Sequence, residues 1–482
     1  MPYHTDLIHS VSLPLGILSI GTYLEKHGYE VKICDLSVKK QSPEKVCDDF
    51  KPDIAGISFP SCKAIDGIKD VSRILKKRNI PVVWGGSFCD VAQTRHFFGT
   101  GLVDVISYCE GEATWLDLVK AFENNESLDD VKGISFLKNG EIVTTPPREF
   151  MDGSELPRLD FGLVDVPAYF QYLYGCKKVV YVYLSKGCPA HCTFCVNTLC
   201  HRNTRRRRSI DDFMSEIGEL VSVYGADGFY FADELAFVNE DELYEVCDGF
   251  DKIDGDFHWG FQNRIGILGR DALTRAYSSR CRWIDFGVES GNPEMLGKVK
   301  KNIPFDKIES DFAVCCDLGI ISIANFIIGF PGETREQVKD TVELANRLKS
   351  TQNTFTKYIF GEKTPGGIEV MKTSKHYPVF NCLEDYKQMD FFANSQGLSE
   401  IPQKELDVIQ SHFLWKAIFR KDYGKNRDYD LLLKSVSTVL KRIGKMKVSC
   451  AAKALWEIGT LSIRFFFDEK TDKKIHKQYD LK

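Results

Sequence analysis

Short apolar runs alternate with amphipathic stretches over residues 1–125. Four runs have the length and the β-branched content of buried strands. They are "VKICD" (31–35), "IAGIS" (54–58), "VVWGG" (82–86) and "DVISYC" (104–109). Apolar residues between them recur at helical spacing. This alternation predicts an α/β unit with a parallel, doubly wound sheet.

The same unit begins with an expected helix, "GILSIGTYLEKHG", that ends at Gly28. In a flavodoxin-like or Rossmann-like sheet the first strand lies inside the sheet, and its loss would leave neighbouring backbone groups unpaired. We therefore expect the native start to lie upstream of Met1. The alternative is a sheet that closes in some other way.

A connector over residues 126–175 separates this unit from a second, clearer alternation. The connector contains a hairpin candidate, "GISFLKNGEIVTT", with Asn139-Gly140 at its turn. Six strand candidates follow, with helices expected between them. They are 179–185, 227–231, 257–262, 282–288, 321–328 and 356–360. Ser209 and Thr334 each begin a capping-box-like sequence before an expected helix. Six βα units predict a full or partial barrel, whose chemistry lies at the carboxyl ends of the strands.

Residues 366–482 show no strand alternation, and apolar positions over 432–443 fit one helical face. We therefore expect three regions. They are an N-terminal α/β domain (1–150), a partial (β/α)6 barrel (176–365) and a helical C-terminal region (366–482).

The composition is that of an ordinary globular protein, with 43% hydrophobic and 27% charged residues among 482. A net charge of −5 argues against bulk binding to nucleic acid or to anionic membranes. The longest apolar run, 319–330, is too short to span a bilayer, and no secretory signal is visible. We expect a cytoplasmic protein.

One short stretch, "SKGCPAHCTFC" (185–195), places Cys188, Cys192 and Cys195 within eight positions. Most of the other cysteines are scattered and are typical of small buried side chains. Thiolates bind zinc and iron–sulfur clusters, but a structural zinc site usually has four ligands. Cys200 is a weak candidate for a fourth. Three thiolates on a four-iron cluster would instead leave one iron open to a small molecule.

The loop "GCPAHCTFC" resembles the cluster-binding loop of the radical S-adenosylmethionine (SAM) enzymes. The resemblance implies that Cys188, Cys192 and Cys195 hold a [4Fe–4S] cluster whose open iron is chelated by SAM. An electron from the cluster would cleave SAM to a 5′-deoxyadenosyl radical. Segments after the later strands resemble this family's SAM-binding motifs in the same order. The residues implied to contact SAM are Asp233, Glu234, Arg264, Glu289, Gly329 and Gly332.

The N-terminal region resembles the cobalamin (B12)-binding domain that often precedes this barrel. Its segments 12–37, 52–61, 82–90 and 108–122 match the usual layout of that domain. The resemblance implies that cobalamin lies at the carboxyl ends of the strands. The implied contacts are Ser58, Gly85, Gly86, Ser87, Gly111 and Glu112. The chain has no D-x-H-x-x-G motif, so no histidine is marked as a lower ligand to cobalt, and the cobalamin tail would be held away from the metal.

The arginine run at 205–208 precedes an expected helix, where it would oppose the helix dipole. We expect it to be solvated or bound to an anion in a structural role. A substrate phosphate or carboxylate is the alternative. After the sixth strand, "YIFGEKTPGGIEV" departs from the Pro-Gly-Thr pattern of the family.

These resemblances imply an anaerobic enzyme that uses a [4Fe–4S] cluster, SAM and cobalamin to methylate an unactivated carbon. The expected partners are a small-molecule or peptide substrate and a one-electron donor such as flavodoxin or ferredoxin. A radical cyclase, oxidase or rearrangement enzyme fits the same motifs, and a non-catalytic cobalamin- or metal-binding regulator is the third alternative. Thiomethylation of RNA or protein would need further cluster cysteines in the N-terminal domain.

Overall fold

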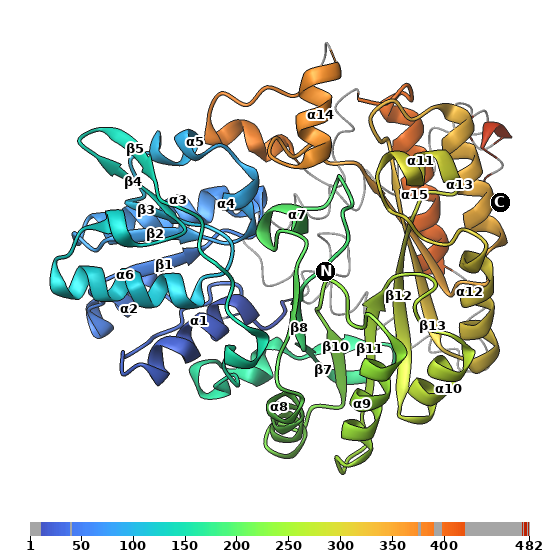
Figure 1. The fold of residues 1–482 in the computed structure, drawn as a ribbon, viewed down its shortest axis with the longest axis horizontal. Helices are drawn as coiled ribbons and strands as arrows, with labels where there is room; N and C mark the ends of the chain where they lie inside the picture. Colours follow the sequence, from blue (N-terminus) through green and yellow to red (C-terminus); the bar gives the residue numbers. More distant parts are fainter. Residues whose placement is uncertain are drawn as a thin grey trace.

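The structure is a computed structural model that describes residues 11–38, 41–374, 377–389 and 398–419, together with 475, 477–479 and 481. Two sheets lie side by side, each with its own helices (Figure 1). The N-terminal unit has five strands, and the larger sheet has seven strands and curls into a half-barrel. The expected architecture, an α/β domain followed by a partial barrel, is therefore confirmed.

The N-terminal sheet has the strand order β1-β2-β3-β4-β5. Strands β1 (Ala55–Ser58), β2 (Val82–Gly85) and β3 (Val105–Ser107) are parallel, as expected from three of the four apolar runs. Strands β4 (Ile134–Lys138) and β5 (Glu141–Thr144) form the predicted antiparallel hairpin. Asn139 and Gly140 turn it with φ of 55° and 85°, in the left-handed region that a tight hairpin turn requires.

The fourth apolar run, 31–35, is not a strand, so this prediction was wrong. It follows helix α1 (Leu15–Lys26), and β1 is the edge of the described sheet on that side. An extended segment becomes a strand only when a neighbour satisfies its backbone groups. Within the described residues, the run at 31–35 has no such neighbour, although its residues have strand propensity.

The half-barrel consists of six parallel strands and one antiparallel edge strand, in the order β14-β13-β12-β11-β10-β7-β6. The parallel strands overlap the six expected ranges, but the last strand begins at Gln352 and shares only residues 356–357 with the expected 356–360. They are β7 (Cys176–Val182), β10 (Gly228–Phe231), β11 (His258–Asn263), β12 (Cys281–Glu289), β13 (Ile321–Ile328) and β14 (Gln352–Lys357). Strand β6 (Gln171–Leu173), which the pattern did not indicate, pairs antiparallel with β7 at the edge.

The helices of the half-barrel lie on its outer side (Figure 1). They are α8 (Ile210–Ser222), α9 (Glu240–Asp251), α10 (Arg270–Ser278), α12 (Lys307–Leu318) and α13 (Arg335–Arg347). Ser209 caps α8 by accepting a 3.3 Å hydrogen bond from the Asp212 amide. Thr334 and Gln337 form a reciprocal capping box on α13. Both predicted helix starts are thus confirmed.

The arginine run forms strand β9 (Arg205–Arg207), which pairs antiparallel with β8 (Ser185–Gly187) ahead of the cysteine loop. Each of the four arginines forms an ion pair with a glutamate of this chain. The anions that neutralise the run are therefore internal carboxylates, as the structural interpretation expected. The deepest pair joins Arg208 to Glu216, and both side chains are almost fully buried.

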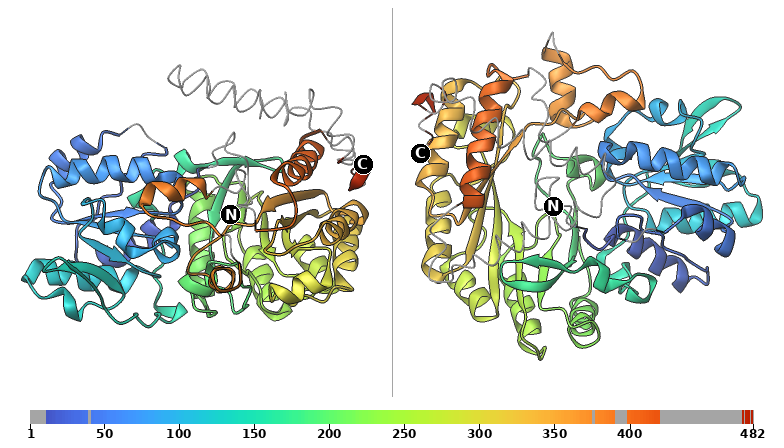
Figure 2. Two further views of the ribbon diagram at one scale, coloured as in Figure 1. Left: turned by 90° about the horizontal axis from the view of Figure 1, so that it is seen from above. Right: turned by 180° about the vertical axis from the view of Figure 1, so that it is seen from behind.

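The C-terminal region crosses from the half-barrel back to the N-terminal unit (Figure 2). It contains α14 (Pro365–Thr373), the 3-10 helix η6 (Leu383–Gln388) and α15 (Gln403–Phe419). Tyr386 packs against Phe88 of the N-terminal unit, and its hydroxyl accepts a 3.0 Å hydrogen bond from the Gln93 amide. The two units therefore share a hydrophobic core. The expected helix over 432–443 lies outside the described residues.

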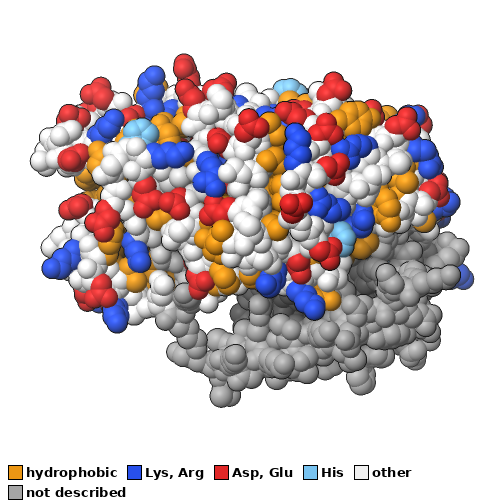
Figure 3. Space-filling model, turned by 90° about the horizontal axis from the view of Figure 1, so that it is seen from below, with side chains coloured by type: hydrophobic (Ala, Val, Ile, Leu, Met, Phe, Trp, Pro, Cys, Tyr) orange, Lys and Arg blue, Asp and Glu red, His pale blue; other side chains and the backbone are white. Residues whose placement is uncertain are grey.

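Acidic and basic side chains are interspersed over the face of the molecule seen from below (Figure 3). Basic residues do not gather in one stripe on the described part of that face. Among the residues that the structure describes, no helix is both long enough and apolar enough to cross a membrane.

Candidate functional site

The cysteine loop lies at the carboxyl end of the half-barrel, between β8 and the short helix α7 (Asn197–Cys200). Cys192 is buried, and Cys188 and Cys195 are half-buried. The loop is held from two sides through Thr193. Its amide donates to the Val299 carbonyl at 3.0 Å, and its carbonyl accepts from the Gly366 amide at 2.9 Å.

The three thiols lie near one another and near two cations. Burial, together with the two other thiols of the loop, raises the pKa of Cys195 to about 12. Arg264 and Lys301 act in the opposite direction on Cys188. Arg264 Nη1 lies 4.0 Å from Cys192 Sγ. Cys188 and Cys195 are therefore neutral as free thiols. A metal centre bound by the loop would deprotonate its ligands, with the two cations compensating the charge.

The donor set fits a cluster better than a single ion. Cys200 is directed elsewhere, because its Sγ donates to Asp90 Oδ2 at 3.3 Å. Among the residues that the structure describes, no three Cys, His, Asp or Glu side chains converge closely enough for one metal ion. Three soft donors on one loop, with the fourth candidate turned away, fit an iron–sulfur cluster with one open iron.

Asp233, a predicted SAM contact, is instead fully engaged by the backbone below the cysteine loop. Its Oδ1 accepts from the Ser185 amide at 2.5 Å and the Ser185 hydroxyl at 2.6 Å. The Leu184 amide donates to Oδ2 at 3.1 Å. Burial raises the pKa of Asp233 to about 7, although these hydrogen bonds act to lower it. The geometry therefore suits a residue that positions β8.

Glu234 has the environment that a SAM contact needs. Its Oε2 accepts from the Gly187 amide at 2.8 Å, one residue before the first cysteine of the loop. Burial alone would raise the pKa of Glu234, but hydrogen bonding and charge from His201 lower it below its usual value. The side chain remains 30% exposed. Glu234 is thus an ionised carboxylate beside the thiols, suited to an ammonium group.

Arg264 and Glu289 lie on the same side of the cysteine loop and share a partner, Lys301. Arg264 Nη2 donates to the carbonyls of Lys301 at 2.5 Å and Asn302 at 2.9 Å. Lys301 Nζ donates to Glu289 Oε1 at 2.7 Å. A Cβ atom on Gly287 would lie 2.8 Å from that ammonium, so glycine at this position leaves room for the ion pair. Sequence reasoning missed Lys301, which lies in a surface-like run, "KVKKN", and carried no signal of its burial.

The predicted glycines of the fifth-strand turn are required by its backbone, since Gly329 and Gly332 have φ of 81° and 67°. Glu333 accepts from the amides of Gly329 at 2.6 Å and Phe330 at 3.1 Å through Oε2. Burial raises the pKa of Glu333 to about 8. Its Oε1 is buried without a hydrogen-bond partner within the described structure. Glu333 therefore shapes the turn as a mostly protonated acid.

Four of the predicted cobalamin contacts lie at the carboxyl ends of β1 and β2. Ser58 ends β1 and is exposed, and Gly85 ends β2. Gly86 has φ of 103°, and a Cβ there would lie 3.0 Å from the Phe59 carbonyl oxygen. Ser87 Oγ donates to the Pro60 carbonyl at 3.1 Å. This edge is the place where a doubly wound sheet binds ligands.

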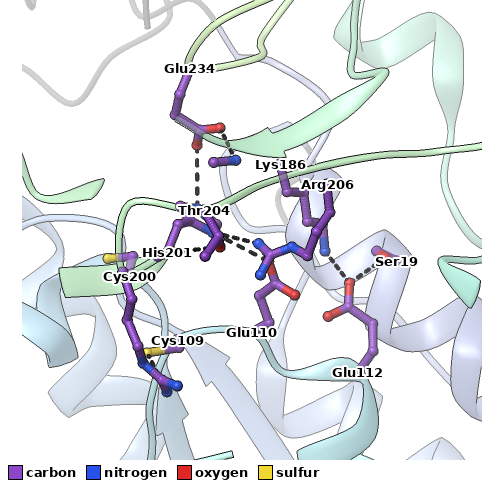
Figure 4. Close-up of polar contacts among 12 residues, drawn as sticks. Ser19, Cys109, Glu110, Glu112, Lys186, Cys200, His201, Thr204, Arg206 and Glu234 are labelled. Carbon is purple, nitrogen blue, oxygen red and sulfur yellow. Dashed lines mark hydrogen bonds and ion pairs between the residues drawn. The ribbon is translucent and has the colours of Figure 1, made fainter. Parts of the chain in front are cut away.

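The other two predicted contacts, Gly111 and Glu112, begin helix α6 (Glu112–Asn124) at the boundary with the half-barrel. Glu112 is 2% exposed, accepts from Ser19 Oγ at 2.5 Å, and pairs with Lys186 of β8 (Figure 4). Burial would raise the pKa of Glu112, but charge and hydrogen bonds from Lys186 and Ser19 lower it. Glu112 therefore joins the two units rather than facing an open ligand site.

A second set of polar contacts crosses the same boundary (Figure 4). His201 lies between Glu110 of the N-terminal unit, 3.2 Å from Nδ1, and Glu234, 3.5 Å from Nε2. Burial opposes its charge, but the two carboxylates raise the pKa of His201 to about 9. Arg206 also pairs with Glu110. Beside this network is a cavity of about 230 Å³, whose lining includes Glu110 and Phe150.

Comparisons with known proteins agree with this arrangement. The family model described as the B12 binding domain matches residues 7–119, and that of the radical SAM superfamily matches residues 182–345. The chain belongs to the radical SAM superfamily and carries an N-terminal B12-binding domain.

The chain is 26% identical over 349 residues to an uncharacterized methyltransferase of Pyrococcus horikoshii, covering 71% of this chain and 75% of that protein. It is 25% identical over 479 residues to the cytidylyl-2-hydroxyethylphosphonate methyltransferase of Streptomyces wedmorensis, covering 86% of each. An anaerobic magnesium-protoporphyrin IX monomethyl ester cyclase of Rubrivivax gelatinosus is 26% identical over 344 residues, or 69% of this chain and 61% of that protein.

Among solved structures, the radical S-adenosylmethionine methyltransferase TsrM of Kitasatospora setae has the same fold, with a TM-score of 0.63 and 17% identity. The match covers 82% of this chain and 83% of that one. The similarity extends over both units.

Proposed function

We propose that this protein is a cobalamin-dependent radical SAM enzyme that methylates an unactivated carbon of a small molecule. The observation that carries the proposal is the three-thiol loop at the carboxyl end of a half-barrel, next to the strand ends of a B12-binding domain. When bound, the cluster and cobalamin would supply, respectively, the electron that cleaves SAM and the methyl group that is transferred.

The residues of this chain would bind and orient these groups. Cys188, Cys192 and Cys195 would hold the cluster. Glu234, ionised and 2.8 Å from the Gly187 amide, would accept the methionyl ammonium of SAM. Asp233 would position the cysteine loop without contacting SAM. Its hydrogen bonds from the Leu184 and Ser185 amides fix strand β8, which leads into that loop.

Arg264, Glu289 and the turn at Gly329 and Gly332 would complete the SAM site. Arg264 has one guanidinium nitrogen on backbone carbonyls and another directed to Cys192, so it would compensate the charge of the cluster and of the SAM carboxylate. Glu289 would accept the ribose hydroxyls only with the oxygen that Lys301 leaves free. Cobalamin would be contacted at the carboxyl ends of β1 and β2 by Ser58, Gly85, Gly86 and Ser87.

The domain limits remain those expected from the sequence, with cobalamin held within 1–150, the radical chemistry within 176–365, and 366–482 as a helical region. The one-electron donor, a flavodoxin or ferredoxin, and a cytoplasmic, anaerobic setting remain predictions. The relationship to a cyclase supports a second candidate, radical ring closure of the substrate without methyl transfer.

The experiment is anaerobic reconstitution of the full chain with iron and sulfide, followed by incubation with SAM and a strong reductant. We expect deoxyadenosine release, and protein isolated from cells supplied with cobalamin should contain it. Deoxyadenosine release together with methyl transfer from SAM to added cobalamin would support the methyltransferase. Deoxyadenosine release by protein that never retains cobalamin would support the cyclase instead. A protein that releases no deoxyadenosine would contradict both.

A further inference from the structure

His201 lies directly after the cysteine loop, at the end of the short helix α7. Its amide donates to the Asn197 carbonyl at 3.0 Å, and its carbonyl accepts from the Thr204 amide at 2.9 Å and the Thr204 hydroxyl at 2.7 Å. The side chain packs against β8, since a Cβ atom on Gly187 would lie 3.0 Å from the His201 Cβ. His201 therefore has a fixed place beside the strand that leads into the thiols.

The ring of His201 faces one carboxylate from each unit (Figure 4). Nε2 lies 3.5 Å from Glu234 Oε1, and Nδ1 lies 3.2 Å from Glu110 Oε1. The side chains of His201 and Glu110 are 13% and 10% exposed, respectively. Opposite charges attract each other more strongly where so little water reaches them than they do at the surface. The ring is therefore a direct connection between the carboxylate suited to SAM and the N-terminal unit.

Arg206 adds a second contact to Nδ1 of the same ring. Its Nη2 lies 3.2 Å from that nitrogen and also pairs with Glu110. In a protonated ring, Nδ1 carries a hydrogen for Glu110, and Nε2 carries one as well. In a neutral ring whose Nδ1 accepts from Arg206, the one ring hydrogen is on Nε2. Both forms therefore place an N–H group on the side of Glu234.

We propose that His201 is a positioning residue for SAM, which holds Glu234 in place for the methionyl ammonium, and that Glu110 of the B12-binding domain holds the ring. This role rests on the proposed function, and it means that the N-terminal unit contributes to SAM affinity. The Gly187 amide donates to Glu234 Oε2 at 2.8 Å, and the ring lies beside Oε1. Each oxygen keeps a second lone pair for the ammonium. A carboxylate fixed at both oxygens loses less freedom when its ligand binds, so binding is tighter.

The charge of the ring gives this role a pH signature. Burial would lower the pKa of His201, but Glu110 and Glu234 raise it to about 9. Burial would raise the pKa of Glu234, but His201 lowers it below its usual value. Without the charged ring, Glu234 would bind a proton about one pH unit higher or more. A protonated Glu234 does not attract an ammonium group, so SAM affinity would then fall at a higher pH.

The other titratable groups around this pair are Glu110, Lys186 of β8, Cys200 of α7, Arg206 of β9 and Asp233 after β10. Lys186 and Arg206 remain cations near neutral pH. Burial raises the pKa of Cys200 well above its usual value, so this thiol stays neutral. Burial also raises the pKa of Asp233 to about 7, and this titration is common to the wild type and to every variant below. The signature is therefore the difference between the pH profiles of wild type and variant.

The first measurement uses the full chain before reconstitution, so it does not depend on the cluster. NMR of isotope-labelled histidine follows the titration of each ring, and the signal that His201→Gln removes belongs to His201. We expect its midpoint to lie well above the usual value of about 6.5. Glu110→Gln and Glu234→Gln should each lower the midpoint, because each removes one of the two carboxylates that face the ring.

The second measurement is the dissociation constant of SAM, obtained by calorimetry on the reconstituted full chain without reductant. His201→Gln and Glu110→Gln should each weaken SAM binding about threefold at pH 8, because Glu234 is less well fixed. As the pH falls to 6, the loss should grow in His201→Gln only, since the ring that remains in Glu110→Gln is still charged. Glu245→Gln is the matched control. It removes the partner of Arg207, the next arginine of β9, and should leave SAM affinity unchanged.

Three outcomes would overturn the role of His201. They are an unchanged His201 midpoint in Glu110→Gln, equal SAM affinity of wild type and His201→Gln, and an equal loss of affinity in Glu245→Gln. Urea midpoints of the same variants separate a loss of SAM affinity from a loss of folded protein. Deoxyadenosine release by the wild type reports separately on the proposed function. A wild type that neither binds SAM nor releases deoxyadenosine would contradict that function, whereas active variants with unchanged SAM affinity would contradict the positioning role alone.

Discussion

Replacing Lys186 by Met removes the positive member of the ion pair that joins the half-barrel to the N-terminal unit. Glu112 would remain 2% exposed, with the Ser19 hydroxyl as its remaining hydrogen-bond donor. Breaking a buried pair by removing one partner costs about 3–5 kcal/mol, because the remaining charge is uncompensated. Lys186 is 16% exposed, so some water reaches the pair, and we expect about 3 kcal/mol.

Glu112→Gln should lower the free energy of unfolding by less, about 1–2 kcal/mol, because the amide oxygen still accepts from Ser19. The Lys186 ammonium also keeps its partial exposure and its place over the Tyr183 ring. The double variant Lys186→Met, Glu112→Gln should cost less than the sum of the two, since neither charge remains.

Urea unfolding followed by circular dichroism measures these differences as shifts of the transition midpoint. Lys138→Met is the matched control, since its pair with Asp129 is well exposed, and we expect no measurable shift. A cost below about 1 kcal/mol for Lys186→Met, or strict additivity in the double variant, would refute the inference that this pair is a buried link between the two units.

Three other predictions concern the site. Cys192→Ser should abolish the visible absorbance of the reconstituted cluster, whereas Cys200→Ser should retain it, and equal loss in both would contradict the three-ligand assignment. For Glu333, the pKa is raised to about 8 in the folded state, so the folded state holds a proton that the unfolded state releases above about pH 4.5. Stability should therefore fall as pH rises from 4.5 to 8, by up to about 1.4 kcal/mol per unit, and Glu333→Gln should remove this part of the slope in urea titrations. For His201, the pKa is raised to about 9, so its ion pairs stabilise the fold fully below about pH 6.5 and are lost as pH rises through 9. His201→Gln should abolish that loss and raise the KM for SAM, while His191→Gln, on the exposed part of the loop, should do neither.

Much of the fold could be predicted because the spacing of apolar residues that marks a helix or a strand is visible within a few residues of sequence. The six strands of the half-barrel, the hairpin at Asn139-Gly140 and the caps at Ser209 and Thr334 each follow from a short pattern of side chains. The strand expected at 31–35 was wrong because strand formation needs a partner as well as a propensity. The edge strand β6 was missed because three residues are too few to show alternation.

Some residues of the candidate site were likewise visible in the sequence, whereas others depend on partners that are distant in the chain. The three thiols were visible because their spacing is short and their chemistry is specific. Asp233 and Glu234 are adjacent in the sequence, yet one faces the backbone of β8 and the other lies beside the thiols, a difference that only their positions at the end of β10 decide. Lys301 and His201 gave no signal, because the partners of each lie elsewhere in the sequence.

The sequence by itself determined the class of the protein, the order of its elements and the thiol donors, since these depend on side-chain types at short, regular intervals. Tertiary structure decided which charges are buried and paired. Glu112, which the family resemblance placed beside a cofactor, binds a lysine 74 residues away across the boundary between the two units. Burial raises the cost of an unpaired charge, so the role of each carboxylate is set by the groups that the fold brings to it.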